Sequence, residues 1–196
     1  MGHAAAKQPM SAAEFLAWEA EQSERHDFVA GEAFAMAGAE DRHVTACLNG
    51  AMALRQHLAG SPCRTYMADM KLQAQDAQSY FYPDVMVTCS AADRADPLIK
   101  REPRLLVEVL SPSTGAYDRG EKFAHYRRLE SLAEMVFIDL DSRRCDVYRK
   151  GADGLWVLHP FERDESLELA SVALRLPPEQ LFAEIDETPP PSAPKQ

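Results

Sequence analysis

The segment from residue 80 to residue 126 constrains the fold most, because it holds two apolar runs that each carry one acidic residue. Asp84 opens the run at residues 85–87, and Glu108 lies inside the run at residues 105–110. A carboxylate in a buried strand costs several kcal/mol unless a metal ion or a paired lysine compensates it. The sequence therefore predicts two buried strands with a polar site where their acids meet.

Helical patterns occur at four places in the chain. Residues 11–14 have the form of a capping box, which predicts a helix to about residue 22. Asp41 is the predicted cap of a helix to about residue 58, whose apolar residues recur at helical spacing and indicate that it covers a sheet. Residues 117–131 and 177–185 are also predicted to be helical.

Strand patterns fill most of the remaining chain. They lie at residues 26–30, 33–36, 63–66, 70–74, 80–89, 104–110, 134–140, 145–149 and 155–161. A turn at residues 75–78 and a polar loop at residues 91–103 separate some of them. Strand, helix and strand between residues 104 and 140 resemble a βαβ crossover or a helix lying on a mixed sheet, so we expect an α/β domain.

The length of 196 residues fits one domain with a full core. We expect a flexible N-terminus at residues 1–10, a domain at residues 11–187 and a disordered proline-rich tail at residues 188–196. No apolar run approaches the length of a membrane span, and the N-terminus lacks the apolar core of a secretion signal. A cytoplasmic protein with no membrane contact is the resulting prediction.

The four cysteines, Cys47, Cys63, Cys89 and Cys145, lie far apart in the sequence. None forms a Cys-x-x-Cys pair, which argues against a zinc knuckle. In a protein without a secretion signal we expect reduced thiols that mainly fill the core.

The net charge of −10 is unfavourable for a nucleic-acid-binding protein, since phosphate contact requires Lys and Arg. The charge is uneven, however. Residues 94–150 contain 12 basic and 10 acidic residues, whereas the remainder contains 9 basic and 21 acidic residues. The segment that contains Glu108 is thus the only basic part, which permits a nucleic-acid partner without arguing strongly for one.

Asp84, Glu108 and Lys122 are the candidate catalytic residues. If the two acid-bearing strands are neighbours, both carboxylates can bind one Mg²⁺, and Lys122 can orient water or neutralise developing charge. In the alternative interpretation, Asp84 belongs to a strand-entry turn, Glu108 pairs with a Lys or Arg, and Lys122 faces solvent. Spacing alone leaves both interpretations open.

The motifs PDV, LLVEVLSPST, DRGEKFAHY and FIDLD, with HDFVAGEAFAM upstream, resemble the Uma-two family of endonucleases. The resemblance covers roughly residues 11–150, and VEVLSPST followed by Asp-x3-Lys-x3-Tyr is far more specific than a lone Pro-Asp. The family is similar to the wider PD-(D/E)XK nucleases. The resemblance implies an α/β restriction-endonuclease-like fold, a mixed central sheet flanked by helices, in a homodimer that cleaves DNA with Mg²⁺, for which Mn²⁺ can substitute.

The chain departs from these patterns at two positions. The wider superfamily expects Lys two residues after Glu108, where this chain has Leu110. In the Uma-like pattern the following helix supplies the lysine, which is Lys122 here. The Tyr-Glu dipeptide of the Uma-like pattern matches His26-Asp27, so a carboxylate is kept but its role is open.

Five further residues are accessory candidates: Asp27, Glu32, His43, Asp118 and Tyr126. His43 can serve as a base or phosphate ligand, or lie at a helix surface. Glu32 follows a turn glycine and is either an outer ligand or a solvated acid. Asp118 suits a helix N-terminus, and Tyr126 lies one turn after Lys122 on the same face.

Other activities find less support in the sequence. It lacks a Gly-x-Ser-x-Gly elbow, a Walker A loop and a dinucleotide-binding glycine fingerprint, which argues against acyl hydrolases and nucleotide-binding folds. The main rival to a nuclease is a binding or regulatory module that keeps the nuclease fold without turnover. The net acidity and Leu110 in place of lysine favour this rival.

Overall fold

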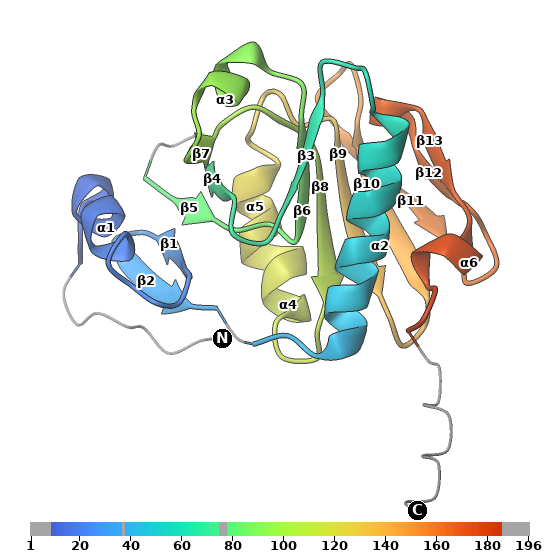
Figure 1. Cartoon of the computed structure of the whole chain (residues 1–196), viewed down its shortest axis with the longest axis horizontal. Helices are drawn as coiled ribbons and strands as arrows, with labels where there is room; N and C mark the ends of the chain where they lie inside the picture. The colour runs from blue at the N-terminus through green and yellow to red at the C-terminus, as the bar shows by residue number, and fades with distance from the viewer. Residues whose placement is uncertain (1–8, 37, 75–77, 186–196) are drawn as a thin grey trace, which may run out of the picture.

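The computed structural model describes residues 9–36, 38–74 and 78–185. Apart from Pro9 and Met10, the expected flexible N-terminus and the expected proline-rich tail lie outside the described residues. The fold is mixed α/β, with a six-stranded sheet, a five-stranded sheet and a two-stranded hairpin (Figure 1). This confirms the predicted fold class.

The six-stranded sheet forms the centre of the molecule, with the order β11-β10-β9-β8-β6-β3. Its strands are β3 (Arg64–Met67), β6 (Val85–Thr88), β8 (Pro103–Leu110), β9 (Glu134–Asp139), β10 (Arg144–Lys150) and β11 (Trp156–Phe161). The pair β8–β9 is parallel and the other neighbours are antiparallel, so the sheet is mixed. The apolar run around Glu108 is buried on both faces, as the sequence predicts.

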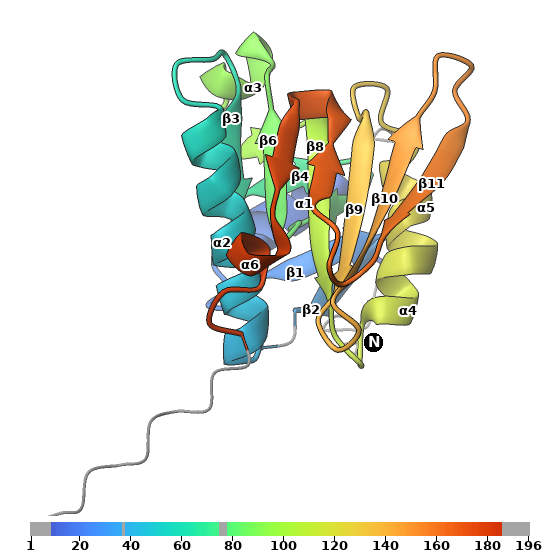
Figure 2. The same cartoon turned by 90° about the vertical axis from the view of Figure 1, so that its right-hand side faces the viewer.

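Helices cover both faces of this sheet (Figure 2). Leu105, Val107 and Val109 of β8 share a core with α2 (Asp41–His57). Leu106 packs on the opposite face, in a core with the helical segment at residues 115–126. Because strand side chains alternate, Glu108 shares the face of Leu106 and points toward that helical segment.

The helix α2 begins one residue earlier than expected, since its cap is Glu40 and Asp41 is its first residue. The carboxylate of Asp41 instead accepts a hydrogen bond of 2.6 Å from the backbone of Arg42. Among the described residues, no helix has the length and apolar character required to cross a membrane.

The five-stranded sheet has the order β2-β1-β5-β4-β7. Its strands are β1 (His26–Val29), β2 (Glu32–Ala35), β4 (Lys71–Gln73), β5 (Tyr80–Phe81) and β7 (Ile99–Lys100). The turn between β1 and β2 uses positive φ angles at Ala30 and Gly31, 51° and 88°. Beside this sheet lies α1 (Ala12–Glu19), which starts with the predicted capping box.

The prediction of one strand over residues 80–89 is wrong. The chain leaves the smaller sheet after β5, passes through Tyr82, Pro83 and Asp84, and enters the central sheet as β6. Pro83 lacks the N–H that a continuous ladder requires, so a break there is physically favoured. Asp84 consequently lies at the crossing between the two sheets.

The helical prediction for residues 117–131 is confirmed only in part. The helix runs through α4 (Gly115–Tyr117), the π-helical turn η1 (Asp118–Lys122) and α5 (Phe123–Tyr126). It ends five residues before the predicted end, as Leu129 and Leu132 turn back into the apolar core. A π-turn inserted into a helix often marks a functional site, and this one carries Lys122.

Some elements escape the sequence prediction. The expected polar loop at residues 91–103 contains the helix α3 (Ala91–Ala95) and the strand β7. Near the C-terminus, β12 (Leu167–Leu169) and β13 (Leu174–Leu176) form a hairpin around the 3-10 turn η2 (Ala170–Val172). The predicted closing helix is shorter, α6 (Pro178–Leu181). The predicted turn at residues 75–78 lies outside the described residues except for Gln78.

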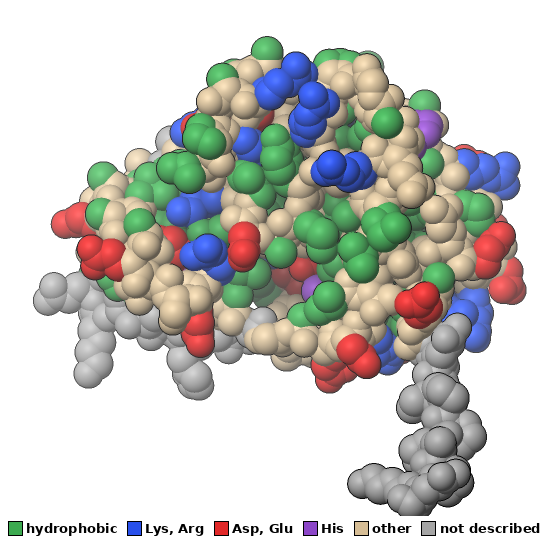
Figure 3. Space-filling model, viewed as in Figure 1, with side chains coloured by type: hydrophobic (Ala, Val, Ile, Leu, Met, Phe, Trp, Pro, Cys, Tyr) green, Lys and Arg blue, Asp and Glu red, His purple; other side chains and the backbone are tan. Residues whose placement is uncertain are grey.

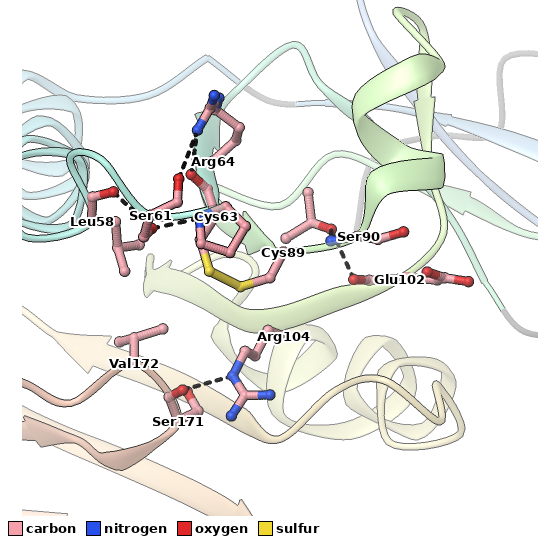
Figure 4. The surroundings of a disulfide bond; sticks show 12 residues. Leu58, Ser61, Cys63, Arg64, Cys89, Ser90, Glu102, Arg104, Ser171 and Val172 are labelled. Atoms are coloured by element: carbon pink, nitrogen blue, oxygen red, sulfur yellow. Dashed lines mark hydrogen bonds between the residues drawn. A yellow bond between two sulfur atoms is a disulfide. The ribbon is translucent and has the colours of Figure 1, made fainter.

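The expectation of four reduced thiols is wrong, because Cys63 and Cys89 form a disulfide (Figure 4). The antiparallel pairing of β3 with β6 sets Arg64 opposite Thr88, and the next pair outward is the two cysteines. Their Cα atoms are 3.9 Å apart, although the two residues are 26 positions apart in sequence. Cys47 and Cys145 are free and buried, as expected for core-filling thiols.

Candidate active site

Asp84 occupies the junction between the two sheets and is fixed there by its neighbours. Its Oδ2 atom accepts a hydrogen bond of 2.7 Å from the backbone N–H of Val109, near the end of β8. The same oxygen lies 3.2 Å from Nε2 of His43, the third residue of α2. Asp84 is therefore tied to the strand that carries Glu108.

Glu108 is almost completely buried, with 3% of its surface exposed. Its Oε1 atom lies 2.8 Å from Nζ of Lys122 and accepts a hydrogen bond of 2.9 Å from the hydroxyl of Tyr126. The sequence analysis placed Lys122 and Tyr126 one turn apart on one helix face, and in the structure both side chains reach Glu108. Of the alternative interpretation, the pairing of Glu108 with a Lys or Arg is confirmed, whereas a solvent-facing Lys122 is wrong.

Lys122 lies among three carboxylates. Besides Glu108, the Nζ atom is 3.7 Å from Asp118 on the preceding turn and 3.9 Å from Asp27 on β1. The Asp27 carboxylate also accepts a hydrogen bond from the backbone N–H of Tyr82. All of these acids are buried, so one lysine compensates several negative charges.

Burial, with a contribution from the neighbouring acids, shifts the pKa values at this site. Burial raises the pKa of Glu108 to about 8, with Asp84 and Asp118 adding to the rise and Lys122 opposing it. Burial also raises the pKa of Asp27 and of Asp118, again against the effect of Lys122. The geometry therefore favours a further positive charge at this site.

Burial alone would lower the pKa of Lys122, but Glu108, Asp27 and Asp118 together raise it above its usual range. The hydrogen bond to Asp84 raises the pKa of His43, against the effect of partial burial. Lys122 is therefore a cation at neutral pH and cannot act as a proton acceptor there.

Asp84 and Glu108 each have a carboxylate oxygen of the type that a hard divalent cation prefers. Among the described residues, the hydrogen-bond and ion-pair partners of Glu108 contact only its Oε1 atom. Those of Asp84 contact only its Oδ2 atom. Each acid thus keeps a second oxygen for a further ligand. Mg²⁺ prefers such oxygen donors and usually takes one or two protein carboxylates with several waters. The donor set of Asp84 and Glu108 matches that preference.

The Asp84 end of the site opens to the surface. The side chains of Asp84 and His43 are 18% and 20% exposed, whereas those of Glu108 and Lys122 are 4% and 7% exposed. Figure 3 shows acidic and histidine side chains in a hollow beside the N-terminal half of α2. A ligand can therefore approach the buried carboxylates from the side of Asp84.

A family profile described as "Uma2: Putative restriction endonuclease" matches residues 12–179. The chain belongs to the Uma2 family. Two relatives from Synechocystis are similar to it, both described as uncharacterized proteins. The first, slr1290, is 37% identical over 84% of this chain and 87% of its own length. The second, sll1609, is 33% identical over 76% of this chain and 85% of its own length.

A crystal structure from Anabaena variabilis is similar to this Uma2 chain in fold. It is described as a "putative nuclease belonging to DUF820". The two structures align with a TM-score of 0.75 and 17% sequence identity, over 89% of this chain and 98% of the other. At this identity the likeness supports the nuclease-like fold alone.

The structure brings together most of the residues that the Uma-like motifs indicate. Asp27, Glu108, Asp118, Lys122 and Tyr126 form one buried cluster, and Asp84 with His43 lies at its open side. Glu32 does not join them. It is exposed at the start of β2, and no ion pair or hydrogen bond links its side chain to the cluster within the described part of the chain.

Three residues near the site were not singled out by the sequence analysis. Tyr82 donates its hydroxyl to the buried Glu19 and its backbone N–H to Asp27. Tyr117 lies close enough for Asp27 to contribute to its raised pKa, after burial as the main cause. Cys47 places its sulfur 3.6 Å from His43 Nδ1. The helical spacing of His43 and Cys47 was the available signal for that contact.

Proposed function

We propose that this protein is a Mg²⁺-dependent endonuclease that hydrolyses phosphodiester bonds in DNA. Asp84 and Glu108 would hold the metal ion, and Lys122 would stabilise charge. The observation that carries the proposal is the combination of a surplus of buried carboxylates with one unused oxygen on each of these two acids. A divalent cation would offset the burial, and the repulsion from Asp84 and Asp118, that raise the pKa of Glu108.

Each side chain has a distinct part in this proposal. When bound, Mg²⁺ supplies a Lewis acid that polarises the phosphate and favours ionisation of the attacking water. Lys122, held as a cation by its carboxylate neighbours, orients that water or neutralises charge that develops on the phosphate. Tyr126 and Asp118 keep Glu108 and Lys122 in place. His43 orients Asp84 and can donate a proton at the open side.

DNA is the proposed substrate because the Uma2 family is described in terms of restriction endonucleases and the fold agrees with that description. The net charge of −10 makes this a demanding proposal, since repulsion weakens DNA binding unless metal ions and local basic residues offset it. We further propose that Mn²⁺ can replace Mg²⁺. Assembly as a homodimer and a cytoplasmic location remain predictions.

A plasmid-nicking assay tests the proposal. The wild-type protein with Mg²⁺ or Mn²⁺ should nick or linearise supercoiled DNA, and a chelator should stop the reaction. Asp84→Asn and Glu108→Gln should each lower the rate at least about a hundredfold, as when one electrostatic catalytic group is removed. Glu130→Gln, which changes an exposed acid in the turn that follows α5, serves as the matched control and should retain the rate.

Two outcomes would contradict the proposal. Equal rates for the wild-type protein and both acid variants would identify a contaminating nuclease. Metal binding and DNA binding without cleavage would instead support the rival function, a nuclease-fold binding module. A parallel assay with single-stranded and duplex RNA decides between DNA and RNA as the substrate.

A further inference from the structure

A second group of metal-binding side chains lies at the open side of the site, on the face of the sheet that α2 covers. His43 and Cys47 are one turn apart on α2, so both side chains project in the same direction. His43 Nε2 lies 3.2 Å from Asp84 Oδ2, and Cys47 Sγ lies 3.6 Å from His43 Nδ1. One ligand atom from each of the three residues falls within 4.8 Å of the other two.

This spacing suits a tetrahedral metal ion. Bonds of about 2.0–2.3 Å from Zn²⁺ to nitrogen, oxygen and sulfur place the ligand atoms about 3.3–3.8 Å apart. The two measured contacts involve different nitrogens of the His43 ring, and one ion takes only one of them. A set with one ligand atom from each residue lies within 4.8 Å, and side-chain rotations shorten these distances to the tetrahedral range. Asp84 is already fixed by the backbone of Val109, which limits the movement that binding requires.

The ligand types differ from those at the proposed Mg²⁺ site. A thiolate, an imidazole and a carboxylate together favour zinc and neighbouring transition metals, whereas Mg²⁺ selects oxygen. Cys47 is 5% exposed, while the side chains of His43 and Asp84 are about one-fifth exposed. An ion can enter past His43, and a water molecule from that side can complete its coordination.

We propose that His43, Cys47 and Asp84 form a binding site for a divalent cation of the zinc class. This site and the proposed Mg²⁺ site have Asp84 in common, whereas Glu108 belongs to the Mg²⁺ site alone. One consequence rests on the proposed nuclease function. A zinc-class ion that binds Asp84 withdraws this carboxylate from the Mg²⁺ site and inhibits cleavage.

Cobalt is a direct probe of this site, because a cysteine thiolate bound to Co²⁺ gives a charge-transfer absorption in the near ultraviolet. The titration is done without reductant, so that Cys63 and Cys89 stay paired. We expect a band that saturates at one Co²⁺ per chain and disappears on addition of Zn²⁺. Cys47→Ser should remove it, and His43→Gln should weaken Co²⁺ binding at least about tenfold.

Cys145→Ser is the matched control, since Cys145 is the other free buried thiol and lies in the same apolar core as Cys47. This variant should keep the band. Absence of a band in the wild-type protein, or an unchanged band in Cys47→Ser, would overturn the proposal. If Cys47→Ser unfolds, His43→Gln decides the question, since that side chain lies outside the core cluster.

A crossed experiment separates this inference from the nuclease proposal. Glu108→Gln should abolish Mg²⁺-dependent cleavage and keep the cobalt band. Cys47→Ser should lose inhibition by Zn²⁺, measured relative to its own Mg²⁺-dependent rate. A cobalt band in a protein that never cleaves DNA would support the cation site and refute the nuclease function. Cleavage without a cobalt band would refute the cation site and support the nuclease function.

Discussion

Glu108 and Glu134 are both buried acids on adjacent parallel strands, yet their surroundings differ. Glu134, the first residue of β9, is 2% exposed. Its carboxylate accepts hydrogen bonds from Arg149 and from the backbone N–H groups of Ala170 and Ser171. Both of its oxygens are used. Glu108 uses one oxygen for Lys122 and Tyr126 and lies among further carboxylates.

Burial of an acid therefore does not by itself mark a functional site. The Glu134 carboxylate has an arginine and backbone donors, which compensate its charge and hold the η2 turn against the central sheet. The Glu108 carboxylate shares one lysine with Asp27 and Asp118. The first arrangement is a complete structural anchor, whereas the second is short of positive charge, which supports the metal ion that we propose there.

The largest expected difference between the two acids is in stability. Glu134→Gln should lower the free energy of unfolding by about 3 kcal/mol, because it removes a charge-assisted pair and weakens two backbone contacts. Glu108→Gln should stay within about 1 kcal/mol of the wild type below pH 8, since the acid it replaces is mostly neutral there and the amide keeps an oxygen for Tyr126. Urea unfolding in the presence of a chelator measures both values.

An equally large loss of stability in Glu108→Gln would break the comparison. It would mean that Glu108 and Lys122 form an ordinary structural ion pair. The comparison would also fail if Glu134→Gln bound Mn²⁺ more weakly than the wild type at a temperature where both proteins are folded.

The pH dependence of metal binding is the next largest effect. The folded-state pKa of Glu108, about 8, is higher than its ordinary value of 4.5, so the neutral acid favours the folded state and ionisation destabilises it as pH rises through this range. Metal binding needs the ionised acid. Mn²⁺ affinity should therefore fall about tenfold for each pH unit below pH 8 and level off above it.

Calorimetric Mn²⁺ titrations at several pH values measure this slope. His43 also has a raised pKa and contacts Asp84, so its protonation can add to the effect. The variant His43→Gln separates the two groups. If Glu108 dominates, the slope persists in this variant. An affinity that does not change with pH in the wild type would show that Glu108 is not a ligand.

The smallest expected effect concerns Tyr126. Tyr126→Phe removes one hydrogen bond to Glu108 Oε1 and should lower the stability by about 1 kcal/mol. Loss of this support should weaken Mn²⁺ binding about tenfold, the lower end of the range for groups that orient metal ligands. Tyr148→Phe is the control and should keep the metal affinity. The ring of Tyr148 packs against Phe123.

Much of the site could be predicted from the sequence, since its signals are local. An acid inside an apolar strand indicates a buried charge, and the spacing of Asp118, Lys122 and Tyr126 places them on one helix face. The motif resemblance added Asp27, which lies far from the others in sequence. The structure confirms that Lys122 reaches Glu108, although Leu110 occupies the usual lysine position.

The features that sequence reasoning missed depend on pairing between distant segments. The disulfide requires the register of β3 against β6, which no local pattern fixes. The break in the strand at Pro83 could be predicted, because proline lacks a backbone N–H donor. The passage of the chain from one sheet to the other could not be predicted. The contrast between Glu108 and Glu134 also depends on tertiary partners, because Arg149 and the η2 turn come from distant parts of the chain.

Anomalous diffraction from crystals soaked in Mn²⁺ tests the central claim most directly. The account predicts a Mn²⁺ peak between Asp84 and Glu108, within bonding distance of the oxygen on each that no described residue contacts, with Lys122 still beside Glu108. Glu134 should have no peak. A structure at saturating Mn²⁺ with an unchanged Glu108–Lys122 pair and no ion at Asp84 would contradict the account, and Glu108 would then be a structural acid like Glu134.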